Sequence, residues 1–332
     1  MWNLIKKIIK QNKLTFKIGR CVLDYYESIK GTRYSRELQH KVLSREISLK
    51  KAINNIQERW PHLGNEIENE SEKAPIFILS AGWRSGSTLM QRLIMSKERV
   101  LMWGEPYNHA GLIDKLSAPI KAFADAKWPP EQFFLSNYDS DNLSTLWVAN
   151  LFPDVKYLRQ AGRAFISTLL KQPAMEIGFD YWGMKEVRLT IDHAHYLKWL
   201  YPNAKFIFMF RNPYKTYMSY RPCRDWYHTW PDQPVFTPKD FAKHWVTLAA
   251  GYVNGYQEVG GILVKYEDLI NGRFDISRLK EYLSMDIDTK ILTTKIGSSN
   301  VKSNEIPKFE FLQIKKIVEP LASSLGYHFK DI

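Results

Sequence analysis

The stretch that decides the fold is Ile76–Met90, whose sequence is IFILSAGWRSGSTLM. An uncharged apolar run ends in a small, glycine-containing turn, and a helix-compatible segment follows the turn. Backbone N–H groups at the start of such a helix converge on an anion, so this layout is typical of a phosphate-binding loop. The lysine of the nucleotide-triphosphatase pattern G-x-x-x-x-G-K-[ST] is absent. The cation here is Arg84, before the second glycine, which favours a phosphate-like group other than ATP with magnesium.

A second segment points to the same chemistry. Lys205–Phe210 is an apolar run typical of a buried strand, and Arg211 follows it directly. Asn212 is a good N-cap and Pro213 fits the first position of a helix. Ser219 then lies two turns into that helix, on the face that carries Asn212. Arg211 and Ser219 can together hold one phosphate, the arginine as a fork and the hydroxyl as a donor.

These two segments, in this order, resemble the sulfotransferases that use 3′-phosphoadenosine-5′-phosphosulfate (PAPS). The resemblance implies that an [RK]-x-G-[ST]-[ST] loop binds the 5′-phosphosulfate and an R-N-P-x-x-x-x-x-S segment binds the 3′-phosphate. The matching residues are Arg84, Ser85, Gly86, Ser87, Thr88, Arg211 and Ser219. The sequence of Trp83–Ser87 is most similar to the carbohydrate-sulfotransferase branch. Weaker similarities lie in Lys265–Leu269 and Leu325–Tyr327, and the resemblance covers roughly residues 74–330.

Glu105 is the candidate general base. It follows the apolar run Val100–Trp103 and precedes a proline, a context in which carbohydrate sulfotransferases often use a base glutamate, so the resemblance implies that role. A carboxylate can serve if burial raises its pKa toward neutrality. Two other interpretations remain open: Glu105 caps a turn or pairs with a nearby cation, or His109 is the base.

Lys185 and Arg84 complete the predicted catalytic set. The cytosolic branch of the family has a Lys-x-His segment here, with a base histidine, but this chain has Val187 in the third place. That departure removes the histidine mechanism and favours Glu105. The resemblance implies that Lys185 contacts the bridging oxygen or the sulfuryl group. Arg188 holds an anionic acceptor or anchors the site. Alternatively, Lys185 and Arg188 are simply solvated or paired with Glu186 and Asp192.

A small polar loop, Gly297–Ser303, contains Lys302. Sulfotransferases often close a loop from this region over the nucleotide, so the resemblance implies that Lys302 reaches the 3′-phosphate. The spacing differs from the Arg-Lys-Gly form of the cytosolic branch.

From Ala74 onward, strand and helix signals alternate as a parallel sheet requires. The predicted strands are 76–81, 100–103, 183–185, 205–210 and 261–264. The predicted fold class is α/β, a three-layer sandwich with a central parallel sheet, similar to P-loop nucleotide triphosphatases. Ligands of such sheets bind beyond the carboxyl ends of the strands.

The composition fits one large core, since the chain has 332 residues of which 45% are hydrophobic. A net charge of +12 favours anionic ligands such as PAPS, and equally nucleic acid or anionic lipid. Cys21 and Cys223 form no disulfide framework or zinc spacing and fit a reducing compartment. No stretch approaches the about 20 apolar residues that cross a bilayer. We therefore expect a cytoplasmic enzyme, with no nucleic-acid partner, and the resemblance implies no metal.

Residues 1–73 lie outside the resemblance. Within residues 1–20, apolar and basic side chains fall on opposite sides of a predicted helix. Such a segment lies peripherally on an anionic membrane, packs on the domain or is a frayed, solvated end, and these interpretations stay open. The acidic stretch Glu66–Glu72 indicates a linker. The predicted organisation is a helical N-terminal extension with linker, 1–73, and a sulfotransferase domain, 74–332.

Aromatic residues bear on the acceptor; the notable ones are Trp128, Trp147, Trp182, Trp226, Tyr227 and Trp230. Aromatic rings stack on sugar faces, although they are equally ordinary core material. The predicted reaction is direct in-line transfer of the sulfuryl group of PAPS to a hydroxyl, on a saccharide or glycolipid, with a carboxylate base. The alternatives are a P-loop kinase that uses ATP and a basic, non-enzymatic binder of nucleic acid or membrane.

Overall fold

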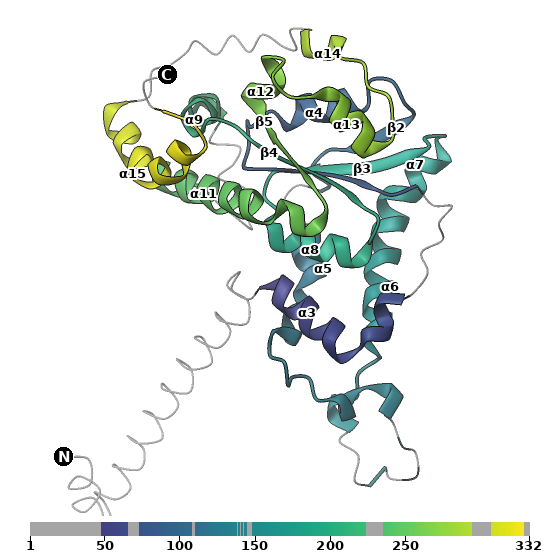
Figure 1. The fold of residues 1–332 in the computed structure, drawn as a ribbon. Helices are drawn as coiled ribbons and strands as arrows, with labels where there is room; N and C mark the ends of the chain where they lie inside the picture. The colour runs from purple at the N-terminus through teal and green to yellow at the C-terminus, as the bar shows by residue number, and fades with distance from the viewer. Residues whose placement is uncertain are drawn as a thin grey trace, which may run out of the picture. The chain divides into compact units, whose positions relative to one another are not determined.

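The computed structural model describes residues 48–65, 73–107, 110–137, 139, 141, 143–144, 148–223, 235–293 and 307–328. Five parallel strands form one sheet in the order β2-β3-β1-β4-β5 (Figure 1). Their bounds are β1 Ile76–Ser80, β2 Val100–Trp103, β3 Tyr181–Glu186, β4 Lys205–Phe210 and β5 Ile262–Lys265. All five predicted strands are confirmed; β3 is longer than predicted. Every residue of β1 is buried, as expected for the centre of a parallel sheet.

Helices connect the strands. The α-helices are α3 Leu49–Arg59, α4 Ser87–Ile94, α5 Leu112–Ser117, α6 Val155–Ile166, α7 Gln172–Glu176, α8 Ile191–Leu200, α9 Pro213–Tyr220, α11 Pro238–Gly255, α12 Tyr266–Ile270, α13 Ile276–Leu283, α14 Lys290–Thr293 and α15 Lys308–Ser324. Short 3₁₀ turns are η1 Pro61–Asn65, η3 Ala118–Ala124, η4 Glu131–Phe133, η5 Leu135–Asn137, η7 Val148–Asn150, η9 Arg221–Cys223 and η10 Tyr256–Val259, and η8 Ser167–Lys171 is a π-helical turn.

Two apolar cores lie on opposite faces of the sheet. One joins alternate strand residues such as Phe77 and Phe208 to α8, α11 and α15. The other joins Ile78 and Met209 to α4, α12 and α13. Figure 1 shows these two groups of helices on either side of the strands. The predicted three-layer α/β sandwich is therefore confirmed.

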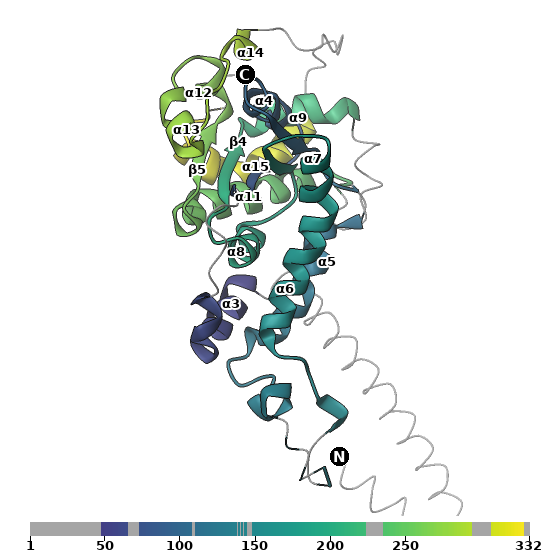
Figure 2. The ribbon, with the colours of Figure 1, turned by 90° about the vertical axis from the view of Figure 1, so that its right-hand side faces the viewer.

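Residues 49–332 form one compact unit, and α3 is part of it. Its buried face includes Ile53 and Ile56, and α3 packs against α8 and η3. Figure 2 shows α3 next to α8. Of the predicted helical extension, residues 1–47 and 66–72 lie outside the described part of the chain, and so does the predicted membrane-contacting segment. The predicted division after residue 73 stays a prediction. Among the described helices, none is both long and apolar enough to cross a membrane.

The parallel order brings four predicted residues to one edge of the sheet. Arg84 follows β1, Glu105 follows β2 and Arg211 follows β4, while Lys185 lies near the end of β3. Because β1 pairs with both β3 and β4, the loop after β1 lies between the other two strand ends. This edge is where the sequence predicts a ligand.

Candidate active site at the carboxyl edge of the sheet

The two predicted anion-binding segments contact each other directly. Arg84 Nε donates a hydrogen bond to Ser219 Oγ at 2.9 Å. Arg211 Nη1 donates to the backbone oxygen of Arg84, also at 2.9 Å. The neighbouring strands β1 and β4 aim both loops at the same point, and these two bonds lock them together. Segments separated by more than 120 residues in the sequence thus form one site.

The loop after β1 has an unusual backbone. Gly82, Arg84 and Gly86 all have positive φ angles, of 81°, 65° and 93°. The left-handed region costs a non-glycine residue on the order of 1–2 kcal/mol, so Arg84 is held there by its surroundings. A Cβ at Gly86 would lie 2.1 Å from Cδ2 of Tyr266, so only glycine fits beneath that ring. No side chain caps the start of α4, which leaves its first N–H groups for an anion.

The hydroxyl residues of the loop have different surroundings. Ser85 is fully buried, and its Oγ donates to the backbone oxygen of Gly82 at 2.5 Å and shares a bond with Ser80 Oγ. The Ser85 hydroxyl therefore stabilises the loop, and its backbone N–H is the group left for a ligand. Ser87 is buried at the helix start, whereas Thr88 is exposed.

Arg211 is fixed by aromatic and polar neighbours. Its guanidinium lies over the Tyr266 ring, 4.6 Å from the ring centroid, and Trp245 Nε1 donates to its backbone oxygen at 3.1 Å. Its buried Nε has no hydrogen-bond partner among the described residues. A buried donor without a partner is costly, which indicates a ligand group at this point.

The turn after β4 forms as predicted, and a distant segment holds it. Asn212 caps α9 by accepting from the backbone N–H groups of Tyr214 and Lys215, and Pro213 begins the helix. Glu267 accepts from the backbone N–H of Asn212 at 3.0 Å and from the Tyr327 hydroxyl at 2.6 Å. This explains physically why Lys265–Leu269 and Leu325–Tyr327 accompany the two motifs.

Both motifs line one cleft of about 490 Å³. Its lining residues are Arg84, Gly86, Thr88, Leu89, Arg92, Arg211, Ser219, Tyr266, Ile270 and Leu292. Three of them are arginines and none is acidic. The sequence predicted five of these ten as ligand-binding residues. Tyr266 is part of Lys265–Leu269, which has only a weak similarity to the family. Leu89, Arg92, Ile270 and Leu292 belong to no motif, so only the fold identifies them.

A second cavity, of about 520 Å³, lies elsewhere in the unit. Its lining includes Lys50 of α3, Trp199 of α8 and Glu258 of η10, and none of the predicted site residues. Pro202, just before β4, also lines it, which puts this cavity toward the amino ends of the strands. The candidate active site is therefore the arginine-lined cleft at the carboxyl edge.

Glu105 and Lys185 form an ion pair, with side chains only 15% and 8% exposed. Neighbouring strands β2 and β3 bring them together. The sequence left open whether Glu105 is a base or the partner of a cation, and the structure shows that it has a cation partner. Its role as base stays a prediction. A nearly buried carboxylate and ammonium at this edge can exchange a proton with a ligand or stabilise charge on it.

A second charged pair lies deeper. Burial raises the pKa of Glu186 from 4.5 to about 7, although the nearby Arg188 opposes the shift. Arg188 Nη2 lies 3.6 Å from Glu186 Oε1, and Arg188 is only 3% exposed. Pairing of Arg188 with Glu186 is confirmed, whereas a solvated side chain or contact with an acceptor does not fit a residue so buried. The sequence did not predict Glu186 as a site residue, because the sequence of a strand does not show how deeply one of its charged residues is buried.

The remaining predicted residues differ in where they lie. His109, Lys302, Trp147, Trp226, Tyr227 and Trp230 lie outside the described residues. Trp182 is 2% exposed and packs edge-on against Phe77, so it belongs to the core and is not available to an acceptor. Trp128 is 46% exposed. In the described part of the chain, no group of His, Cys, Asp and Glu is arranged to hold a metal ion.

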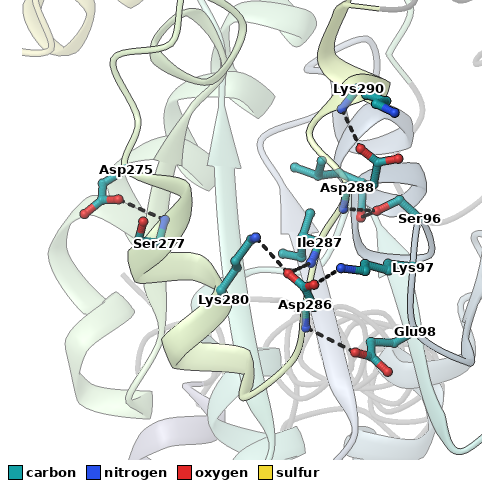
Figure 3. Close-up of polar contacts among 11 residues, drawn as sticks. Ser96, Lys97, Glu98, Asp275, Ser277, Lys280, Asp286, Ile287, Asp288 and Lys290 are labelled. Atoms are coloured by element: carbon teal, nitrogen blue, oxygen red, sulfur yellow. Dashed lines mark hydrogen bonds and ion pairs between the residues drawn. The ribbon is translucent and has the colours of Figure 1, made fainter.

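An ionic anchor supports one wall of the cleft (Figure 3). Asp286 accepts from Lys280 Nζ at 2.7 Å and forms an ion pair with Lys97, which precedes β2. The backbone N–H of Asp288 donates to Ser96 Oγ at 2.8 Å. These bonds fix the connection between α13 and α14, and α14 carries Leu292 of the cleft.

A model of the sulfotransferase family matches residues 75–283. No curated protein matches the chain. Similar solved structures include the sulfotransferase domain from the curacin biosynthetic pathway, 16% identical with a TM-score of 0.41, over 77% of this chain and 98% of that one. The sulfotransferase domain of the Synechococcus PCC 7002 olefin synthase is 19% identical with a TM-score of 0.41, over 78% and 98%. Mouse sulfotransferase SULT7A1, complexed with PAP, is 10% identical with a TM-score of 0.38, over 77% and 86%.

The family match covers both anion-binding segments, the Glu105–Lys185 pair and well over half of the 332 residues. The chain therefore belongs to the sulfotransferase family.

Proposed function

We propose that this protein transfers the sulfuryl group of PAPS to the hydroxyl of an acceptor and releases 3′-phosphoadenosine-5′-phosphate (PAP). The observation that carries the proposal is the contact between the two anion-binding segments. Arg84 and Arg211 come from different loops, are joined through Ser219 and the Arg84 backbone, and line one cleft without an acidic residue in its described lining. A ligand with two separate phosphate groups suits this pair of segments.

The donor supplies a sulfuryl group on a good leaving phosphate, and the protein supplies position and charge. The N–H groups at the start of α4, with Arg84, suit the 5′-phosphosulfate. Arg211, whose buried Nε has no partner among the described residues, and Ser219 suit the 3′-phosphate. Lys302 is proposed as a further 3′-phosphate contact. Positioning and electrostatic stabilisation should dominate catalysis, as in phosphoryl transfer.

Glu105 is proposed as the general base. Its carboxylate accepts the proton of the acceptor hydroxyl while the acceptor oxygen bonds to sulfur and the bond from sulfur to the phosphate oxygen breaks. Lys185, its ion-pair partner, stabilises the charge that develops on the sulfuryl and bridging oxygens. The electron pair of the broken bond leaves with PAP, so atoms and charge balance without a metal.

The acceptor is proposed to be a hydroxyl on a saccharide or glycolipid. The support is the similarity of Trp83–Ser87 to the carbohydrate branch. A panel of mono- and oligosaccharides, with phenols and alcohols as the comparison, tests this part separately. Sulfation of phenols alone would contradict the proposal of a saccharide acceptor and leave the assignment of PAPS as donor intact.

The donor assignment is tested by thermal shift and calorimetry with PAP, ADP and ATP with magnesium. A ligand at about 100 times its Kd stabilises the fold by about 2.7 kcal/mol. We expect preference for PAP. We expect Arg211→Ala to lose most of that preference, because the 3′-phosphate loses the bidentate hydrogen bonds of the guanidinium. Preference of the unmodified protein for ATP would instead support a kinase and overturn the proposal.

A further inference from the structure

Arg92 is a cleft residue that neither anion-binding motif contains. It lines the cleft with Arg84 and Arg211. Those two arginines are bonded to each other's segments, whereas Arg92 is exposed and has no hydrogen bond or ion pair with any described residue. An arginine in a cleft whose described lining has no acid is available to a ligand.

The position of Arg92 separates it from the phosphate-binding groups. It lies five residues after Ser87, so its backbone is about 7.5 Å along the axis from the start of α4. Leu89 is three residues before it and lies on the same face. Arg92 therefore lies farther along α4 than the first N–H groups of the helix, which suit the 5′-phosphosulfate.

Part of the lining of the cleft that contains Arg92 is aliphatic. Leu89, Ile270 and Leu292 line the same cleft, and Ile270 is 42% exposed although it is a large aliphatic residue. Three aliphatic side chains and one guanidinium suit a flat group with apolar faces and hydrogen-bond acceptors on its edge. Purine bases have this character, because their ring nitrogens accept and arginine only donates.

We propose that Arg92 is a specificity-determining residue that donates hydrogen bonds to ring nitrogens of the donor's base, in the half of the cleft walled by Leu89, Ile270 and Leu292. This assignment rests on the proposed function, since it assumes a nucleotide donor. Arg84 and Arg211 then select for the two phosphates, and Arg92 selects for the base, which is attached to the same ribose.

Calorimetry with two ligands tests the assignment: PAP, and ribose 3,5-bisphosphate, which keeps the phosphates but has no base. Competition up to millimolar concentration extends the range for the weaker ligand. We expect Arg92→Ala to weaken PAP roughly tenfold or more, as for loss of a charged donor, and to change ribose 3,5-bisphosphate by less than about twofold. Arg278→Ala is the matched control. Arg278 is exposed on α13, lies outside the cleft lining and has no hydrogen bond or ion pair with any described residue.

Each other result is decisive. Equal weakening of both ligands in Arg92→Ala would show that Arg92 acts only through its charge, and unchanged PAP affinity would show that it does not contact the base; either overturns the assignment of Arg92 alone. An unmodified protein that binds neither ligand would overturn the proposed function, and this inference with it. Urea unfolding of each variant confirms that the exposed substitution leaves the fold intact.

Discussion

Arg84 contributes to the candidate site through both its backbone and its side chain. Its backbone has φ 65°, its Nε donates to Ser219 and its carbonyl oxygen accepts from Arg211. A non-glycine residue stays in the left-handed region only when its surroundings fix it, and such residues cluster at functional sites. The positive φ angle and the two hydrogen bonds are consistent with the proposed function, in which the backbone of the loop binds an anion while the Arg84 side chain reaches across to α9.

Glu105→Gln tests the base at the same scale. An amide cannot accept the acceptor's proton, so we expect turnover to fall by about two orders of magnitude or more, with PAP affinity nearly unchanged. The amide oxygen can still accept from Lys185, which limits the loss of stability that breaking a buried pair would cause. Steady-state kinetics and calorimetry on the same preparations measure both quantities.

A matched control for this variant is Glu281→Gln, an exposed carboxylate on α13, which should leave turnover unchanged. Retention of turnover in Glu105→Gln would contradict the base assignment and make His109 the candidate. Loss of PAP affinity in parallel with turnover would instead mean that Glu105 supports the cleft through Lys185.

At the scale of elements, the sequence predicted well those features that are local. Each strand is an apolar run with a turn after it, and Asn212 with Pro213 marks the start of α9. The strands and this helix start could therefore be predicted from the sequence. Ile270 and Leu292 were not, because they enter the cleft from α12 and α14, short elements without a periodic pattern. The pairing of Glu105 with Lys185 depends on β2 lying beside β3, and strand order does not follow from strand positions.

The ionic anchor of Figure 3 leads to a prediction for α14. Lys280 and Lys97 hold the pKa of the Asp286 carboxyl below its usual range, so both pairs favour the charged form. Asp286→Ala releases the connection that carries Leu292, and we expect PAP affinity to fall by about two- to fivefold, the scale of exposed ion pairs. Calorimetry at one fixed ionic strength measures it, because salt screens such pairs.

Asp275→Ala is the control within the same figure. Asp275 caps α13 by accepting from the backbone N–H of Ser277 at 2.9 Å and does not contact the anchor. Its loss should cost stability of about 1 kcal/mol without changing PAP affinity. Equal affinity in both variants and the unmodified protein would show that the anchor does not position the cleft wall.

At the scale of the whole molecule, titrating groups act in opposite directions. Asp286 and Glu258 have lowered pKa values because lysines pair with them, so their contribution is present at neutral pH and is lost as pH falls through the folded pKa. Both side chains are more than a third exposed, and solvent screening keeps the effect small. Glu186 acts in the opposite sense, since burial raises its pKa to about 7. Its contribution is full below the unfolded value of 4.5 and is lost as pH rises through 7.

Stability should therefore be greatest at mildly acidic pH, and Glu186→Gln isolates the cause. The difference between 4.5 and about 7 corresponds to about 3 kcal/mol at full burial, and a neutral amide removes it. We expect the free energy of unfolding of the unmodified protein to fall by most of that amount relative to the variant between pH 5 and pH 8, measured by urea unfolding at each pH. Glu281→Gln, an exposed carboxylate, should follow the unmodified protein throughout. Parallel curves for Glu186→Gln and the unmodified protein would mean that Glu186 keeps its charge in the fold, held by Arg188, and that the optimum arises elsewhere.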